Sequence, residues 1–343
     1  HTQVYQKMIL ICAIIQLCYP IIIIVRGMRM LIFIKAISGV LIILIMIALG
    51  FILARNDWFD EKSTSLIARL VTQIALPAYM ISTIMGKFSA HKLLTTLPDL
   101  VFPVISMFLL YIVSIIIART SNISMKHRGL FESMFSNSNT VFVGLPVNMA
   151  LFGPISLPFV LVYYMANTTF FWTLGVYLIQ KDGRNAAVFN WKQTLKKVFS
   201  PPLLGFMVGV LLVLIHVKLP DFLMQDLTYV GDLTIPLSMI FIGISINSVN
   251  LMDIHFDRSN FLILLGRFLL APSVMTLLVV FTPMPILMKQ VFIMQSAMPI
   301  MTNAPVVSRL YHADSEYASI MVTETTLLSL IVIPVLMVLV QKL

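Results

Sequence analysis

The chain has 343 residues, of which 59% are hydrophobic and 11% are charged. An ordinary soluble domain carries roughly 25% charged residues, so a soluble enzyme and a disordered chain are both excluded. The composition indicates a polytopic membrane protein, in which lipid surrounds most side chains. The net charge of +9 does not indicate a nucleic-acid partner, because the basic residues lie almost wholly in short connections between apolar stretches.

A transmembrane helix needs about 20 apolar residues, and this length predicts ten spans along the chain. They are expected at residues 31–54, 64–85, 99–118, 130–152, 156–180, 199–217, 228–249, 260–282, 286–309 and 317–341. An earlier apolar stretch, 8–25, is interrupted by Gln16 and Pro20. It could be an extra helix, a signal-like segment or sequence upstream of the true start. We expect residues 1–29 to lie outside the functional core and to be dispensable.

The charges of the connections predict the orientation. If the first span enters from outside, thirteen Lys and Arg residues fall inside and eight fall outside. The positive-inside rule then places both ends of the ten-helix core outside the cell. The predicted organisation is a first five-helix unit over 30–181, a cytoplasmic connection over 182–198 and a second five-helix unit over 199–343.

The second half of the chain repeats the first at a nearly constant separation. Gln73-Ile-Ala-Leu-Pro77 matches Asp232-Leu-Thr-Ile-Pro236 after 159 residues, and Gly144-Leu-Pro146 matches Ala297-Met-Pro299 after 153 residues. A third match, of Asn167-Thr-Thr with Glu324-Thr-Thr, has a separation of 157 residues. Five helices are an odd number, so the second unit enters the membrane from the opposite side. This predicts an inverted repeat, the architecture of many secondary transporters.

Spans four and nine each carry a proline within their apolar length, Pro146 and Pro299. A proline removes a backbone hydrogen bond and costs about 3 kcal/mol in a helix interior. The freed backbone groups persist at bilayer depth only where they are buried in protein or line a cavity. If the two interrupted helices cross, the positive ends of their half-helices predict an anion site near the midplane.

The motif of span four, Asn139-Thr-Val-Phe-Val-Gly-Leu-Pro146, resembles the Asn-x-Gly-Phe-x-Gly-x-Pro motif of the auxin efflux carrier family. Val141 replaces the first glycine of that motif, which narrows the space beside Asn139. The segments 297–299 and 325–334 also resemble the last two helices of the family. The resemblance covers about residues 30–343.

The resemblance implies an all-α fold of ten transmembrane helices, arranged as two inverted five-helix repeats with broken, crossing helices four and nine. The family includes plant auxin exporters and bacterial carriers described as malate permeases. A span-four asparagine contacts the substrate carboxylate in the plant members, and the resemblance carries this role to Asn139. The short connection between the two repeats is similar to that of the bacterial carriers.

The candidate substrate-binding residues lie at the two interruptions. They are Asn139, Gly144, Pro146, Asn148, Pro299, Thr302 and Asn303. Asn137 and Asn148 could equally hydrogen-bond neighbouring helices, which is the usual role of asparagine in membranes.

Two acids are candidates for ion coupling. Glu324 lies well inside the last span, where an ionisable group costs about 2.5–3.5 kcal/mol and is expected to face a cavity or a partner. Asp232 lies less deep and could be a coupling group or a residue of the interface. Arg267 in span eight is expected to pair with an acid or to extend toward the membrane surface, a structural role.

These features predict a secondary transporter of small organic anions, either malate-like dicarboxylates or monocarboxylates, in the plasma membrane. It would work by alternating access, coupled to protons, to sodium or to no ion. The sequence contains no Gly-x-x-x-x-Gly-Lys-Ser/Thr, no Gly-x-Ser-x-Gly and no His-Glu-x-x-His, so we expect no ATP hydrolysis and no enzymatic activity. No cofactor or metal site is expected, because Cys12 and Cys18 share one stretch and the six histidines are scattered. A passive channel or uniporter of the same fold is the alternative, and a homodimer remains open.

Overall fold

A computed structural model describes residues 41–183, 199–247 and 257–341, and the regular elements in these ranges are helices. The predicted extra segment 1–29 lies outside the described residues, as does most of the 182–198 connection. The elements of the first half are Leu41–Arg55, α2 (Glu61–Leu70), η1 (Val71–Ala75), α3 (Leu76–Lys87), α4 (Ala90–Thr96), η2 (Leu97–Leu100), α5 (Val101–Thr120), α6 (Arg128–Ser136), η3 (Thr140–Gly144), α7 (Leu145–Phe152), η4 (Pro154–Ser156), α8 (Leu157–Phe170), η5 (Phe171–Gly175) and α9 (Val176–Asp182). Those of the second half are α11 (Pro201–Leu214), α12 (Asp221–Asp232), α13 (Thr234–Asn247), α14 (Arg258–Leu265), η7 (Gly266–Leu270), α15 (Ala271–Val279), α16 (Ile286–Ser296), α17 (Asn303–Leu310) and α18 (Ser315–Val340).

Helical structure occupies each of the ten predicted stretches as far as they are described. Within the described ranges, six continuous helical segments are long and apolar enough to cross a membrane: Glu61–Lys87, Leu93–Thr120, Pro154–Asp182, Asp221–Asn247, Arg258–Val279 and Ser315–Val340. Large apolar side chains such as Phe281, Leu277 and Ile331 are exposed on the outside of the protein, as expected for surfaces that contact lipid. The prediction of an all-α protein with several membrane-spanning helices is therefore confirmed.

Most prolines inside the long helices do not break them. Pro77, Pro146 and Pro272 each follow a π-helical segment after one intervening residue. For example, Leu76 N–H donates to the carbonyl five residues earlier, and Ala271 N–H does the same. The wider turn shifts the hydrogen-bond ladder just before a residue that cannot donate, so the helix continues past the proline.

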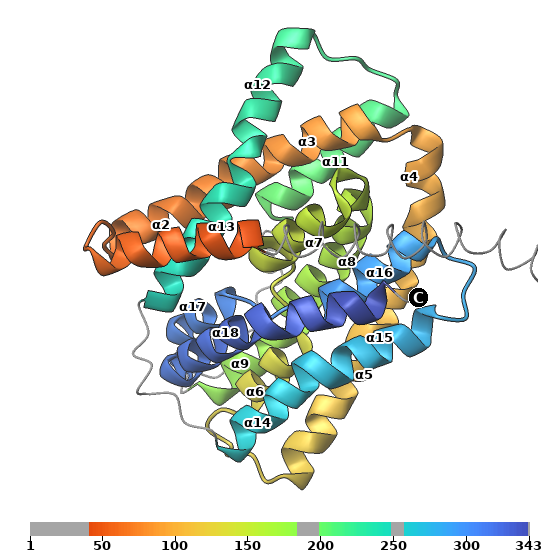
Figure 1. The fold of residues 1–343 in the computed structure, drawn as a ribbon. Coiled ribbons are helices and arrows are strands. Elements are labelled where there is room, and N and C mark those ends of the chain that lie inside the picture. Colours follow the sequence, from red (N-terminus) through yellow and green to blue (C-terminus); the bar gives the residue numbers. More distant parts are fainter. Residues whose placement is uncertain (1–40, 184–198, 248–256, 342–343) are drawn as a thin grey trace, which may run out of the picture.

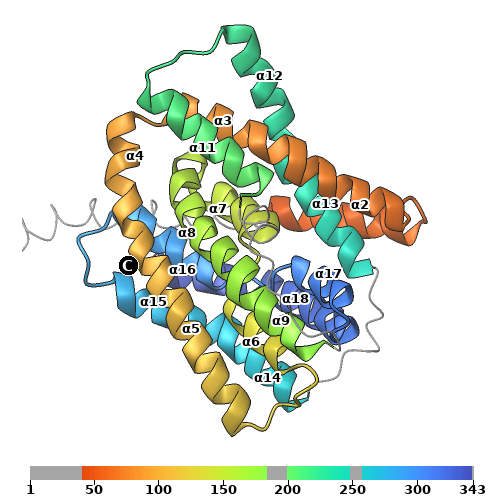
Figure 2. The same cartoon turned by 180° about the vertical axis from the view of Figure 1, so that it is seen from behind.

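One group of helices is formed by Leu41–Arg55, α2–α3, α11 and α12–α13, and we call it the four-span group. The front and back views show α2, α3, α11, α12 and α13 together on one side of the molecule (Figure 1, Figure 2). Its helices approach closely at glycines, where a Cβ would touch a neighbouring backbone. A Cβ on Gly243 would lie 2.1 Å from Ile47 O, and one on Gly205 would lie 2.6 Å from Pro77 Cα. Small residues of this kind allow membrane helices to pack by close backbone contact.

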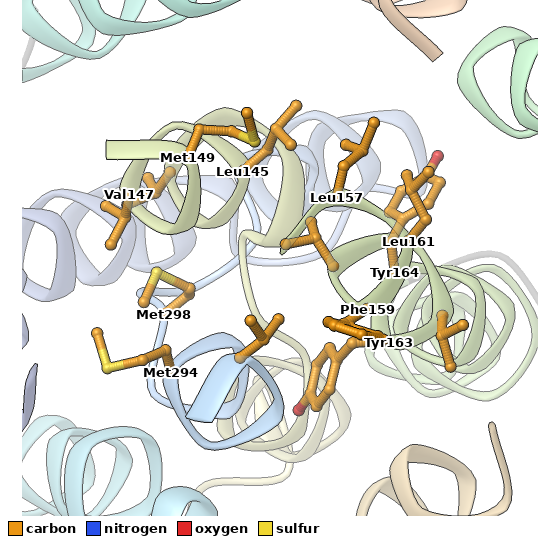
Figure 3. Close-up of a cluster of buried hydrophobic side chains, with 14 of the residues drawn as sticks. Leu145, Val147, Met149, Leu157, Phe159, Leu161, Tyr163, Tyr164, Met294 and Met298 are labelled. Carbon is orange, nitrogen blue, oxygen red and sulfur yellow. The ribbon is translucent and has the colours of Figure 1, made fainter. Parts of the chain in front are cut away.

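The remaining helices form a second unit, which we call the six-span group: α4–α5, α6–α7, α8–α9, α14–α15, α16–α17 and α18. A cluster of buried apolar side chains from α7, α8 and the region of α16 lies in this group and continues into the four-span group, where Met80 and Met239 belong to it. Figure 3 shows Met294 and Met298 as members of this cluster, on the side where Val147 lies. The packing fixes the positions of two interrupted helices, α6–α7 and α16–α17.

Candidate functional site

The first interruption lies at Asn137–Asn139, between α6 and η3. Short polar side chains compete with helical hydrogen bonds, and the run Ser136-Asn-Ser-Asn139 concentrates four of them. Asn167 of α8 holds the interruption, because its Nδ2 donates to Ser138 O at 2.8 Å and its Oδ1 accepts from Ser138 N at 2.9 Å. This location differs from the predicted interruption at Pro146, which lies inside a continuous helical stretch after the π-helical η3.

The second interruption lies between the end of α16 and the start of α17, and it contains Pro299 as predicted. The two interruptions pair with each other. Ser138 and Ile300 form an antiparallel β-bridge, and Asn139 N donates to Pro299 O at 2.7 Å. Thr325 of α18 supports the Ile300 side of the bridge, because its hydroxyl accepts a hydrogen bond from Ile300 N at 3.2 Å. The backbone groups freed by the breaks are thus satisfied within the protein, as burial requires.

A cavity of about 470 Å³ lies between the four-span group and the six-span group. The helices that follow the two interruptions both begin at this cavity. Asn139 and η3 line it at the first interruption, and Thr302 and Asn303 line it at the second. Helix N-terminal ends carry partial positive charge and are suited to anions. The remaining lining residues are Thr72, Gln73, Thr140, Val141, Phe142, Tyr164, Thr168, Trp172, Ser200, Pro201, Pro202 and Met301.

Asn139 uses the two ends of its amide differently. Its Oδ1 accepts from Phe142 N at 3.1 Å and so caps the half-helix that begins with η3. Asn139 lines the cavity as a residue, and its Nδ2 is buried and donates to no acceptor in the described part of the chain. A buried amide donor without a partner is costly. An acceptor bound in the cavity would remove this cost.

Three predicted binding residues come together at the cavity, namely Asn139, Thr302 and Asn303, and four do not line it. Gly144 lies against Gln295 of α16, and Asn148 is fully buried with its Nδ2 donating to Gly144 O at 2.7 Å. Pro146 follows the π-helical turn, and Pro299 contributes its carbonyl to the bridge. Of these four residues, only Pro299 belongs to an interruption, and the other three lie within the η3–α7 helical stretch.

Sequence reasoning missed the side of the cavity contributed by other spans. Gln73 in the second span, Trp172 in the fifth and Ser200 at the start of the sixth all line it. Gln73 enters the sequence argument only through the internal repeat, although a lone amide in an apolar span is itself a signal. Trp172 and Ser200 carry no local signal, because only the packing of the two groups brings them to the cavity.

Asn137 supports the helix-bonding interpretation. Its Oδ1 accepts from the Tyr111 hydroxyl of α5, and its Nδ2 donates to Asn167 O at 3.2 Å. The side chain is 1% exposed and does not line the cavity. Asn137 therefore ties the first interruption to α5 and α8.

The two candidate coupling acids lie at different interfaces. Glu324 of α18 is buried, and Asn260 of α14 donates to its Oε1 and Oε2 at 3.1 and 3.3 Å. Asp232 is the last residue of α12 and is exposed, next to Gly231, which packs against Tyr79. Glu324 is thus a buried acid with an amide partner, one residue from the threonine that supports the bridge.

The structure differs from the prediction for Arg267. This residue neither pairs with an acid among the described residues nor extends to the surface. It is fully buried. Its Nη1 donates to Phe135 O and Ser136 O, its Nη2 donates to Ser296 O and Met298 O, and its Nε donates to Met298 O. The helix-end carbonyls at both interruptions meet at one guanidinium.

Two interrupted helices that pair at their breaks, beside a cavity between two helical groups, define a membrane transport protein. The sequence profile of the family described as membrane transport protein matches residues 35–337. The chain therefore belongs to this family, which is the auxin efflux carrier family indicated by its motifs.

Two archaeal relatives are similar to this chain. An uncharacterized transporter of Methanocaldococcus jannaschii is 25% identical over 300 residues, covering 86% of this chain and 95% of the relative. An uncharacterized transporter of Methanothermobacter thermautotrophicus is 29% identical over 223 residues, covering 63% of this chain and 70% of the relative. The family is described as a membrane transport protein family, and both relatives are named as transporters.

Proposed function

We propose that this protein is a secondary transporter of small organic anions that works by alternating access. The cavity carries this proposal: it lies between two helical groups, at the N-terminal ends of two half-helices, and it is lined by Asn139, whose buried amide donor has no acceptor among the described residues. A carboxylate accepts hydrogen bonds and carries the charge that helix N-termini favour. Movement of one group against the other would open the cavity to each side in turn.

We further propose the architecture expected from the sequence. It consists of inverted five-helix repeats over 30–181 and 199–343, joined by a cytoplasmic connection over 182–198, with residues 1–29 outside the core. The antiparallel pairing of the interruptions in helices four and nine supports a relation by a two-fold axis. The excess of Lys and Arg in alternate connections supports a plasma-membrane protein with both core ends outside.

The cavity favours a monocarboxylate over a malate-like dicarboxylate. Its described lining residues include amides, hydroxyls and aromatic rings but no Lys or Arg. Two helix ends and the Asn139 amide can compensate the desolvation of one carboxylate charge. A second carboxylate would lose its hydration without gaining a cationic partner. Trp172, Tyr164 and Phe142 offer apolar surface to the rest of the molecule.

We propose Glu324 as the coupling residue, with Asp232 as the second candidate. A buried carboxyl group beside an amide can hold or release a proton as its surroundings change. Protons are therefore the favoured coupling ion and sodium is the alternative. No nucleotide or other cofactor has a role in this scheme.

Uptake into proteoliposomes tests the proposed function. Labelled benzoate, acetate and malate would each be measured with and without an imposed pH gradient, and benzamide would serve as the uncharged control. We expect saturable uptake of a monocarboxylate in preference to malate and benzamide. A carrier also exchanges internal unlabelled for external labelled substrate, whereas a channel shows no such stimulation. Preferential uptake of benzamide would contradict an anion site, and absence of exchange would favour the channel.

A further inference from the structure

Arg267 joins the ends of two helices that lie far apart in the sequence. Phe135 and Ser136 end α6, Ser296 ends α16, and Met298 lies in the second interruption. The guanidinium donates five hydrogen bonds to these four carbonyls, with distances of 2.6–3.3 Å. A guanidinium has five N–H donors, so every donor is used.

The neighbouring glycine brings one of these helix ends close. A Cβ on Gly266 would lie 2.2 Å from the Phe135 ring, so no larger residue fits at this position without a shift. The end of α6 can therefore reach the guanidinium of the next residue in η7. Arg267 itself is fully buried and does not line the cavity.

The charge of Arg267 acts on the helix ends that carry the opposite sign. The last carbonyls of a helix lack intrahelical partners and carry partial negative charge. The α6 and α16 ends meet at Arg267, whereas the N-terminal ends of η3–α7 and α17 face the cavity. The bridge between Ser138 and Ile300 separates these negative helix ends from the positive ends at the cavity. Without the charge of Arg267, the negative ends would weaken the positive potential in the cavity.

We propose that Arg267 is a positioning residue for transport. Its charge holds the two negative half-helix ends together and gives the cavity its preference for anions, without contacting the substrate. The proposal deepens the proposed function and rests on the cavity being an anion site.

The preference can be measured without knowing the substrate. The probe is the modification of a cavity cysteine, Met301→Cys, by an anionic sulfonatoethyl or a cationic trimethylammonioethyl methanethiosulfonate. Cys12 and Cys18 are first replaced by serine, and labelling of the purified full chain is followed by intact mass. The ratio of the two rates reports the local potential and cancels changes in thiol reactivity. Met125→Cys, which is exposed outside the cavity, is the matched control position.

In the wild-type background, we expect the anionic reagent to be favoured at position 301 relative to position 125. This first comparison tests the anion site itself. Arg267→Met should lower the ratio at position 301 by about tenfold or more, because the two reagents differ by two unit charges in a poorly screened site. Arg267→Lys should keep most of the preference, and the ratio at position 125 should stay constant in both variants. An unchanged ratio in Arg267→Met would overturn the role of Arg267 while leaving the anion site intact.

A buried arginine can also be needed for folding. Arg267→Gln is therefore a second uncharged variant, because its amide can still donate to a helix-end carbonyl. If both uncharged variants fail to fold, Arg267→Lys decides the question. Retention of the preference in the lysine variant supports a charge effect, and its loss overturns it.

Discussion

At the residue scale, Asn139 combines an observed role in folding with the binding role proposed for it. Its oxygen caps the half-helix, and its buried nitrogen has no acceptor in the described part of the chain. These two roles can be separated by substitution. Aspartate keeps a capping oxygen, whereas alanine removes both the cap and the donor.

We predict that Asn139→Ala and Asn139→Asp both weaken anion binding. A lost hydrogen bond to a charged group costs about 1.5–3 kcal/mol, or roughly ten- to a hundredfold in affinity. Binding of the monocarboxylate found by uptake would be measured on purified protein, together with thermal unfolding. Asn148→Ala is the control, because Asn148 is buried but outside the cavity. If Asn139→Asp binds normally, the amide nitrogen does not hold the substrate.

Glu324 is the second residue whose role can be isolated. We predict that Glu324→Gln abolishes accumulation driven by a pH gradient yet retains exchange of substrate for substrate, because glutamine mimics a permanently protonated acid. The oxygen of the introduced glutamine amide can still accept a hydrogen bond from Asn260, so folding should be preserved. Asp232→Asn is the comparison for the second candidate. Accumulation by the Glu324→Gln protein, driven by the pH gradient alone, would reduce Glu324 to a packing role.

At the element scale, the four-span group depends on glycines where helices cross. A Cβ on Gly243 of α13 would meet Ile47 O at 2.1 Å and Phe51 N at 2.6 Å. Both atoms belong to the backbone of the helix Leu41–Arg55, so a side-chain rotation cannot relieve the clash. The two helices would have to separate.

Gly243→Ala is therefore predicted to destabilise the protein by about 1–3 kcal/mol, the usual cost of overpacking. Gly86→Ala is the matched control within α3, since a Cβ there would meet no described residue within 4 Å apart from its chain neighbours and the backbone of its own helix. This control should be neutral or stabilise by up to about 1 kcal/mol. Thermal unfolding in detergent measures both variants. Equal stability of the two would show that the crossing adapts without cost.

At the scale of the whole molecule, the cavity lies between two groups that must move relative to each other if access alternates. Thr72 belongs to the four-span group and Thr302 to the six-span group, and both line the cavity. Ser200, at the start of α11, lines it from the same group as Thr72. The two cysteine pairs 72/302 and 72/200 therefore differ only in whether they join the groups.

We predict that a flexible bis-thiol reagent stops transport when it links Thr72→Cys to Thr302→Cys. The same reagent should leave transport nearly unchanged when it links Thr72→Cys to Ser200→Cys. Uptake is measured in a background that lacks Cys12 and Cys18, with the single variants as references. Full transport by the linked 72/302 protein would exclude relative movement of the two groups.

The sequence by itself determined the helical class, because lengths of apolar chain can satisfy their backbone in lipid only as helices. It also identified the regions of both interruptions and three cavity residues, because polar runs and prolines weaken helices locally. Tertiary structure decided the rest. Pro146 does not interrupt its helix, since a π-helical turn absorbs it, and the break lies at the run that Asn167 and the bridge can hold. The contacts of Arg267 were decided by carbonyls at the end of α6, 131 and 132 residues away in the sequence, and by those of Ser296 and Met298. Such contacts arise only when distant spans pack together, and no local pattern encodes them.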